Sequence, residues 1–416
     1  MSFTFLHAAD LHLGSPLRGL ALRDEALAQK LAGASRDAFV ELIDRALEEK
    51  IAFALFAGDI FDGDWRDASI ALFFNRQIAR LAKAGVPSFL LKGNHDADSV
   101  VTKSLSLPDL ARQFPTGKVG TFELAEWRVA LHGRGFSHRA ESENLAQTYP
   151  APKPGWFNIG VLHSSLDGRP GHAAYAPCSL DDLRGKNYDY WALGHVHAYE
   201  VVSTDPYVVY PGNLQGRHIR ETGAKGAVLV DVADGEVLGL RRLIVDRARF
   251  AEIVVDASAH DETPALLRAV ELSARDEAAR AEGRLLALRI RLTGASALHG
   301  KFAADPARWR DEIEAAAQRA HEDIVLERFA LETRPLPAPS ARRRGPLDDS
   351  DFDFSALLDE CLDDPDLRRE ALAALAGIDA KIPAGAPPLS EELDALLAQA
   401  RDLALFRAEG GEGEAS

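Results

Sequence analysis

Short apolar runs alternate with longer helical patterns over the first 245 residues. Residues 3–6 and 53–56 are apolar and rich in aromatic side chains, as buried strands often are. Residues 37–49 and 68–84 repeat apolar side chains at the three- and four-residue spacing of an amphipathic helix. Because strands and helices alternate, the pattern predicts an α/β domain over residues 1–245.

A different rhythm begins near residue 250. Arg289 and Arg291 alternate there with apolar neighbours and therefore share one face of a strand, which is either a nucleic-acid contact or a solvated sheet face. The order of elements predicts a small, separate α+β domain over residues 246–334. Its predicted elements are strand 252–255, helix 263–282, strand 286–292, helix 306–319 and strand 324–331.

Prolines and arginines separate this domain from the C-terminal part of the chain. Pro335, Pro337 and Pro339 precede three consecutive arginines, and the segment is too poor in apolar residues to pack, so residues 335–350 are predicted to be a linker. Only helices are predicted over residues 351–409, one of them capped by Ser390. We expect residues 410–416 to be a disordered tail.

The composition restricts where and how the protein acts. The net charge of −16 argues against binding nucleic acid through a broad basic surface. Much of the acidity lies near the C-terminal end, however, and bound cations would change the field at a site. With two cysteines, no signal-peptide pattern and no apolar run of membrane-spanning length, we expect a cytoplasmic protein without membrane contact.

Five short motifs of potential metal ligands occur along the first 200 residues. Nearly all of them directly follow an apolar, β-rich run, so the end of a strand would present them. In an open α/β sheet the strand ends gather functional groups from distant parts of the sequence. The motifs are Asp10-Leu11-His12, Gly58-Asp59, Gly93-Asn94-His95-Asp96, His163 and Gly194-His195-Val196-His197.

The chemistry of these side chains fits a pair of divalent cations. Imidazole, carboxylate and amide oxygen without thiolate suit Mn²⁺, Fe²⁺ or Zn²⁺ better than a structural zinc site. Two residues separated by one position can face the same cavity, as Asp10 with His12 would. Asp59 could bridge two ions about 4 Å apart. Each motif alone has an ordinary explanation as a turn or a strand-end histidine; their joint occurrence favours a metal site.

The ordered motifs resemble those of the calcineurin-like metallophosphoesterases, over about residues 3–217. Within that superfamily, residues 7–14, 175–183 and 188–195 resemble the SbcD-type DNA repair exonucleases, in particular their YhaO-like branch. The resemblance implies a four-layer α-β-β-α sandwich, followed by a small α+β capping domain and a C-terminal helical region. It also implies two divalent metal ions, with Mn²⁺ preferred and Mg²⁺, Fe²⁺ or Zn²⁺ as alternatives.

The same resemblance assigns roles to the motif residues. His95 would protonate or stabilise the leaving oxygen, and Asp96 would fix its tautomer by a hydrogen bond. The implied metal ligands are Asp10, His12 and His197 for one ion, Asn94, His163 and His195 for the other, and Asp59 between them.

Three further residues are candidates for contacting the substrate. Arg134 could contact phosphate, or it could be a surface arginine in a loop. His172 and Tyr175 could line the substrate channel, or they could belong to a merely structural loop.

The family resemblance also implies a function and partners. The predicted activity is metal-dependent hydrolysis of phosphodiester bonds at DNA ends, by a DNA repair exonuclease that binds a coiled-coil ATPase of the SMC/Rad type through its C-terminal helices. Phe352, Phe354, Leu357, Leu358 and Leu362 are candidate contacts, unless the helix folds back on its own chain. The sequence leaves open a small phosphoester as substrate, a catalytically weak scaffold for an ATPase, and a homodimer.

Overall fold

The computed structural model describes residues 1–15, 25–62, 68–98, 106–168, 175–336, 354–379 and 388–408. The described part of the chain divides into two compact units. The first comprises Met1–Ala251 with Ala278–Ala287, and the second comprises Glu252–Glu277 with Leu288–Ser416. The predicted tail, nearly all of the predicted linker, and His172 lie outside the described residues.

Two six-stranded sheets form the centre of the first unit. In the first sheet β1 to β4 are parallel, while β11 pairs antiparallel with β1, and β12 pairs antiparallel with β11. Its order is β12 (Glu236–Ile244), β11 (Gly226–Ala233), β1 (Ser2–Ala8), β2 (Phe53–Ala57), β3 (Ser88–Leu91) and β4 (Ala111–Gln113).

The second sheet contains four parallel strands flanked by two antiparallel ones. Its order is β5 (Gly120–Leu124), β6 (Val129–Gly133), β7 (Phe157–His163), β8 (Tyr190–Gly194), β10 (Tyr207–Tyr210) and β9 (Glu200–Thr204).

The two sheets pack face to face across an aromatic core. Phe5 and Phe53 of the first sheet stack with ring centroids 5.0 Å apart, and Tyr190 of the second sheet meets Phe5 edge-on at 5.3 Å. Consecutive strand residues point to opposite faces, so Phe53 faces the second sheet while Phe56 packs beneath the helices. The continuous apolar runs of the sequence are therefore strands buried on both sides.

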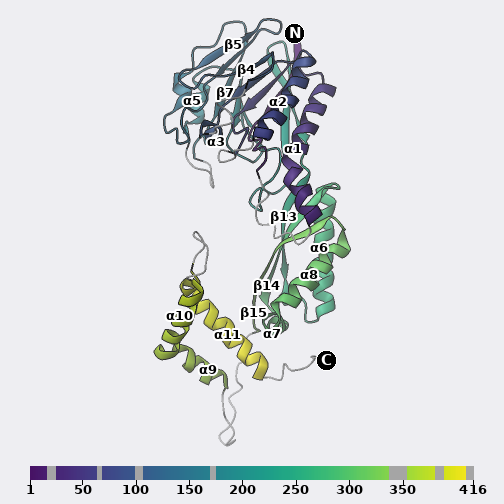
Figure 1. The fold of residues 1–416 in the computed structure, drawn as a ribbon, viewed down its shortest axis with the longest axis vertical. Helices are drawn as coiled ribbons and strands as arrows, with labels where there is room; N and C mark the ends of the chain where they lie inside the picture. Colours follow the sequence, from purple (N-terminus) through teal and green to yellow (C-terminus); the bar gives the residue numbers. More distant parts are fainter. Residues whose placement is uncertain are drawn as a thin grey trace, which may run out of the picture. The chain divides into compact units, whose positions relative to one another are not determined.

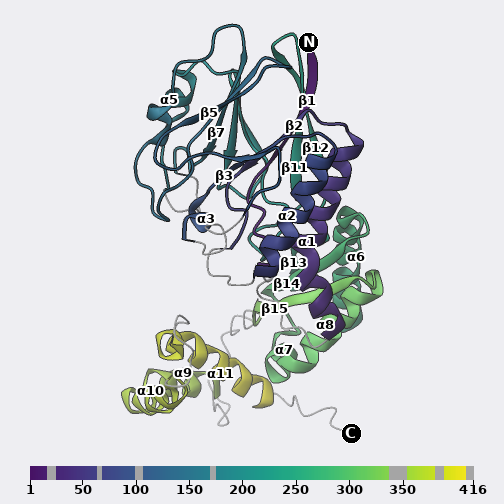
Figure 2. The same cartoon turned by 45° about the horizontal axis from the view of Figure 1, so that its top comes forward.

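Helices cover the outer faces of both sheets. In the views of Figures 1 and 2, α1 (Glu25–Glu48) and α2 (Ala68–Lys83) lie side by side along the first sheet. Phe39 of α1 stacks on Phe74 of α2 at 5.5 Å. The short elements η1 (Leu145–Thr148) and α5 (Leu180–Arg184) contribute Leu145 and Leu183 to a core on the second sheet. These layers confirm the predicted four-layer sandwich.

Helix α1 is longer than the pattern indicated, because it begins at Glu25 rather than near residue 37. Gly33 lies within it, and a glycine inside a helix costs only about 1 kcal/mol. Packing of the buried Ala38 and Phe39 against the first sheet can offset that cost.

Most of a three-stranded sheet and its helices lies in the second unit, as expected for a small α+β domain, although β13, α6 and β14 each have a few residues in the first. The arginines considered as nucleic-acid contacts are paired across the sheet: Arg289 donates to Glu327 at 2.7 Å, and Arg291 to Glu332 at 2.9 Å. The elements are β13 (Ala248–Asp256), η2 (Ala257–Ala259), α6 (Thr263–Ala281), β14 (Leu285–Ala295), α7 (His299–Ala304), α8 (Pro306–Ala320) and β15 (Ile324–Arg334), with strand order β13-β14-β15.

Helices alone follow in the described C-terminal residues: α9 (Phe354–Asp363), α10 (Pro365–Asp379), η3 (Leu389–Glu392) and α11 (Leu393–Ala408). The predicted cap is corrected here. Pro388, not Ser390, precedes η3, and the backbone N–H groups of Leu389 and Ser390 donate to the Asp379 carboxylate at 2.6 and 3.2 Å. None of the described helices is long and apolar enough to cross a membrane.

Candidate metal centre

The ends of strands from both sheets bring the predicted ligands together. Asp10 and His12 follow β1, Asp59 follows β2, and Asn94 opens α3 (Asn94–Asp98) directly after β3. On the second sheet, His163 is the last residue of β7. The remaining two ligands, His195 and His197, follow β8.

The backbone at these positions is strained. The φ angles of four of these residues are positive, in a region of the backbone map that residues other than glycine rarely adopt. They are 51° for Asp10, 42° for His12, 53° for Asp59 and 98° for His195. Each such residue costs about 1–3 kcal/mol and persists only where the surrounding structure holds it. Here the N–H groups of Asp10 and His12 donate to the carbonyls of Gly58 and Asp59 at 3.0 and 3.1 Å, which fixes both loops against each other.

The glycines of the motifs allow the strand ends to approach closely. A Cβ atom on Gly58 would lie 2.4 Å from Nδ1 of His163, and one on Gly93 would lie 2.2 Å from the Asp59 carboxylate. On Gly194 it would meet the carbonyl oxygen of Ala57 at 2.0 Å. A side chain at any of these positions would push a predicted ligand out of place.

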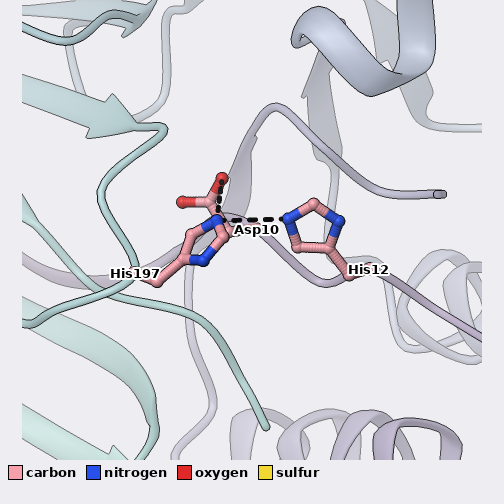
Figure 3. A group of neighbouring side chains, drawn as sticks. All are labelled: Asp10, His12 and His197. Carbon is pink, nitrogen blue, oxygen red and sulfur yellow. Dashed lines mark hydrogen bonds and ion pairs between the residues drawn. The ribbon is translucent and has the colours of Figure 1, made fainter. Parts of the chain in front are cut away.

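Asp10, His12 and His197 form one group of ligand atoms (Figure 3). Nε2 of His12 lies 3.2 Å from Nε2 of His197, which in turn lies 3.9 Å from Oδ1 of Asp10. Asp10 and His12 are buried, at 0% and 2% exposed. Two ring nitrogens and a carboxylate that face one another inside the protein are suited to sharing a cation.

A second group consists of Asp10, Asp59 and His163. Nε2 of His163 lies 3.4 Å from Oδ2 of Asp59 and 3.0 Å from Oδ1 of Asn94. The same Oδ2 of Asp59 is 3.9 Å from Nε2 of His12, so Asp59 also lies near the first group, and Asp10 belongs to both groups.

His195 lies beside the second group. Its ring centroid is 5.2 Å from that of His163, and its backbone N–H donates to the Asp10 carboxylate. The structure therefore brings all seven predicted ligands into one region, and their assignment to individual ions stays a prediction.

The electrostatics of the cluster fit a site for cations. Burial raises the pKa of Asp10 to about 7, with a further contribution from the Asp59 charge. Burial opposes protonation of His163, yet Asp59 and Asp10 raise its pKa to about 9. A proton on His163 therefore compensates part of the buried negative charge. A divalent cation can take over this compensation, with both carboxylates ionised and the imidazoles neutral.

His95 lies at the edge of the cluster and is held by a residue that the motifs did not indicate. Its Nδ1 lies 2.9 Å from Oδ1 of Asp62. Burial opposes protonation of His95, but the hydrogen bond to Asp62 and the nearby Asp59 raise its pKa above the usual value. A histidine that keeps its proton near neutral pH can act as a general acid.

This contact corrects the role expected of Asp96. The buried Asp96 carboxylate accepts hydrogen bonds from the backbone N–H groups of Ile60, Phe61 and Gly93, at 3.0 to 3.1 Å. It thereby joins the loop after β2 to the loop after β3, while Asp62 holds the His95 ring. Asp62 follows Asp59 by three residues, and that spacing is the only signal in the sequence.

The predicted substrate contacts differ in their positions. The Tyr175 ring lies beside His195, with centroids 5.7 Å apart. The side chain of Arg134 donates through Nε to the carbonyl of Thr116 at 3.2 Å. Neither observation tests a substrate contact, and His172 lies outside the described residues.

Sequence reasoning also missed Arg217 and Glu221, which lie behind His197. Glu221 is 6% exposed, and Oε1 of its carboxylate is 2.7 Å from Nδ1 of His197. Burial opposes ionisation of Glu221, but His197 and Arg217 hold its pKa well below the usual value.

Comparison with known families accounts for both domains. The model "Calcineurin-like phosphoesterase" matches residues 3–199, and the model "Metallophosphoesterase YhaO, middle domain" matches residues 250–334. Residues 3–199, just under half of the chain, are therefore similar to the calcineurin-like phosphoesterases. These matches confirm the superfamily and the YhaO branch that the motifs indicated. The family uses divalent metal ions, which agrees with the donor set at the strand ends.

Two relatives show how far this chain resembles known proteins. It is 37% identical over 238 residues to "Uncharacterized metallophosphoesterase YhaO" of Bacillus subtilis (strain 168), covering 56% of this chain and 58% of the relative. It is 26% identical over 257 residues to "DNA double-strand break repair protein Mre11" of Sulfurisphaera tokodaii, covering 58% and 62%. The matched region thus spans about three fifths of each relative's length.

Among solved structures, a dimetal phosphatase from Danio rerio matches with 13% identity and a TM-score of 0.36, covering 59% of this phosphoesterase and 98% of that chain.

Proposed function

We propose that this phosphoesterase is a two-metal DNA exonuclease that hydrolyses phosphodiester bonds at DNA ends during repair. The observation that carries the proposal is a pair of buried ligand groups that share Asp10 and are linked by Asp59, whose Oδ2 lies near both His12 and His163. The similarity to the Mre11 protein supports DNA as the substrate. Mn²⁺ is the proposed ion, because the donor set combines imidazole with oxygen and lacks thiolate.

In this proposal the two ions, once bound, supply positive charge for the phosphate and lower the pKa of a water. Asp10, His12 and His197, which form one observed group, would hold one ion. The family resemblance would give Asn94, His163 and His195 to the other. Asp59 links the two observed groups and would hold both ions.

His95 would deliver a proton to the oxygen of the departing sugar. Asp62 accepts from Nδ1, so Nε2 of a protonated His95 is left to act as the donor. Asp62 also keeps the ring in place through the 2.9 Å contact between Nδ1 and Oδ1. Asp96 would contribute indirectly, because its hydrogen bonds fix the loops that carry Asp59 and His95.

Hydrolysis of defined DNA ends tests this proposal. The full chain is incubated with Mn²⁺ and end-labelled blunt, recessed or hairpin duplex, and in parallel with a nitrophenyl phosphodiester. Cleavage of DNA that disappears on chelation supports the exonuclease. Cleavage of the nitrophenyl ester alone supports the second candidate, a phosphoesterase for small substrates, which the net charge of −16 favours.

We also propose that the C-terminal helices bind a coiled-coil ATPase of the SMC/Rad type. Helices α9 and α10 contain no buried residue, although they carry several leucines. Leu357 is 40% exposed, and Leu372 is 41% exposed. Apolar helix faces of this kind are suited to a groove or a helical partner. Co-purification of the full chain with the candidate ATPase tests this, and failure to associate would exclude it.

We also propose that the protein acts in the cytoplasm. Cys178 is buried and Cys361 is exposed, and both are free thiols, as a reducing cytoplasm would keep them.

A further inference from the structure

Glu221 is a buried carboxylate with several converging donors around it. Oε1 lies 2.7 Å from Nδ1 of His197 and accepts from the Arg217 guanidinium at 3.0 Å. Oε2 accepts from the side-chain amide of Asn213 at 2.9 Å and from the backbone N–H of Arg217 at 2.8 Å. Both oxygens are therefore engaged, and the carboxylate cannot rotate without losing one pair of donors.

These contacts determine which nitrogen of His197 carries the proton. If Nδ1 lacked a proton, its lone pair would face the Glu221 oxygen at 2.7 Å, which is repulsive. With the proton on Nδ1, the ring donates to Glu221, and the Arg217 guanidinium, 3.2 Å from Nδ1, donates to the same carboxylate. Nε2 then keeps its lone pair, which faces Nε2 of His12 and the Asp10 carboxylate (Figure 3).

The backbone of His197 is fixed by the same loop. Its carbonyl accepts from Nζ of Lys225 at 2.9 Å and from the backbone N–H of Asn213 at 3.4 Å. Gly212, with φ of 79°, allows this turn, since a Cβ there would lie 3.1 Å from the same carbonyl oxygen. Both the ring and the peptide of His197 are thus held from outside the ligand cluster.

We propose that Glu221 is a positioning residue that keeps His197 in the tautomer able to bind a divalent cation, with Arg217 holding the carboxylate in place. The proposal rests on the proposed function, since it gives His197 the role of a ligand. A carboxylate behind a ligating imidazole raises its basicity and fixes its orientation, and losing such a partner typically weakens metal binding by about 10- to 100-fold.

The test compares Glu221→Gln with Glu236→Gln in the full chain. Glu236 is an exposed carboxylate at the start of β12, so its variant controls for the loss of one negative charge. A glutamine at position 221 can offer its oxygen to His197 only by pointing its amide hydrogens at the donors of Asn213 and Arg217. We expect Mn²⁺ titration calorimetry to show about 10- to 100-fold weaker binding for Glu221→Gln and no change for Glu236→Gln.

A second measurement needs no substitution. Long-range ¹H–¹⁵N spectra of the metal-free full chain report the tautomer of His197. Its ring signals are identified as those that disappear in His197→Asn. We expect the Nδ1–H form. The inference is overturned if the ring carries its proton on Nε2, or if Glu221→Gln folds and binds Mn²⁺ as tightly as the parent.

The two proposals can fail separately. A parent chain that binds two Mn²⁺ ions but cleaves no DNA contradicts the proposed function and leaves the positioning role testable by calorimetry. A parent chain that cleaves DNA, with a Glu221→Gln variant whose Mn²⁺ affinity and His197 spectrum are unchanged, contradicts the positioning role alone.

Discussion

The metal centre and the helices α9 and α10 differ in how the rest of the chain supports their side chains. At the centre, Asp10, Asp59 and His163 are 0 to 1% exposed and are held by loops from two sheets. In α9 and α10 no residue is buried, and Leu367 is 39% exposed. Substitutions at the centre should therefore change chemistry, whereas substitutions in the helices should change only what the helices bind.

The largest effect is expected for Asp59→Asn. An amide at this position removes the charge that links the two ligand groups, so we expect the loss of both Mn²⁺ ions and of all detectable phosphodiester hydrolysis. Metal analysis after gel filtration measures the first, and hydrolysis of a nitrophenyl phosphodiester the second. Two ions retained per chain would contradict a bridging role for Asp59.

His95→Ala separates chemistry from metal binding. The His95 ring is not among the predicted ligands, so the variant should keep both ions while kcat falls about 10²- to 10⁴-fold, the usual loss for a general acid. Asp62→Asn should give a smaller fall, because the ring remains but loses the partner of its Nδ1. A loss of Mn²⁺ in His95→Ala would assign His95 to the ligand set instead.

These residues also show what the sequence can predict and what it cannot. Asp59 and His163 follow apolar runs directly, so recognising the strand was enough to place the side chain at a strand end. Asp62 and Glu221 reach the site through loops, whose path depends on packing between distant strands. For the same reason, Asp96 was expected to contact a neighbouring side chain but binds backbone amides of another loop.

Element boundaries were predicted well where the local sequence sets them and poorly where distant contacts do. The central strands of the first unit, such as β2 and β7, are buried on both faces, and their apolar runs locate them closely. The start of α1 was placed too late, since Gly33 weakens the local helical pattern but packing on the sheet compensates. The helix that starts at Leu389 is capped by Asp379, ten positions earlier in the chain. No local cap pattern reveals such a partner.

The affinity for Mn²⁺ should rise with pH up to about 9, because below that pH His163 must lose a proton before it can bind a cation. The pKa of His163 is raised to about 9, above its unfolded value, so the stability gained from its protonation is present below pH 6.5 and lost as pH rises through 9. A cation must displace this proton to bind. The affinity for the cation therefore rises by up to about tenfold per pH unit for each proton displaced. Calorimetry at several pH values measures the slope, and a flat profile would argue against His163 as a ligand.

The smallest effect on the enzyme is expected for Leu367→Ser with Leu372→Ser on α10. Both side chains are already 39 to 41% exposed, so the free energy of unfolding should change by no more than about 0.5 kcal/mol. Hydrolysis of the nitrophenyl ester should equal that of the parent. Leu272→Ser on α6, where the side chain is 49% exposed, is the matched control. Only the α10 variant should lose association with the ATPase, and equal losses in both variants would mean that exposed leucines act without regard to their helix.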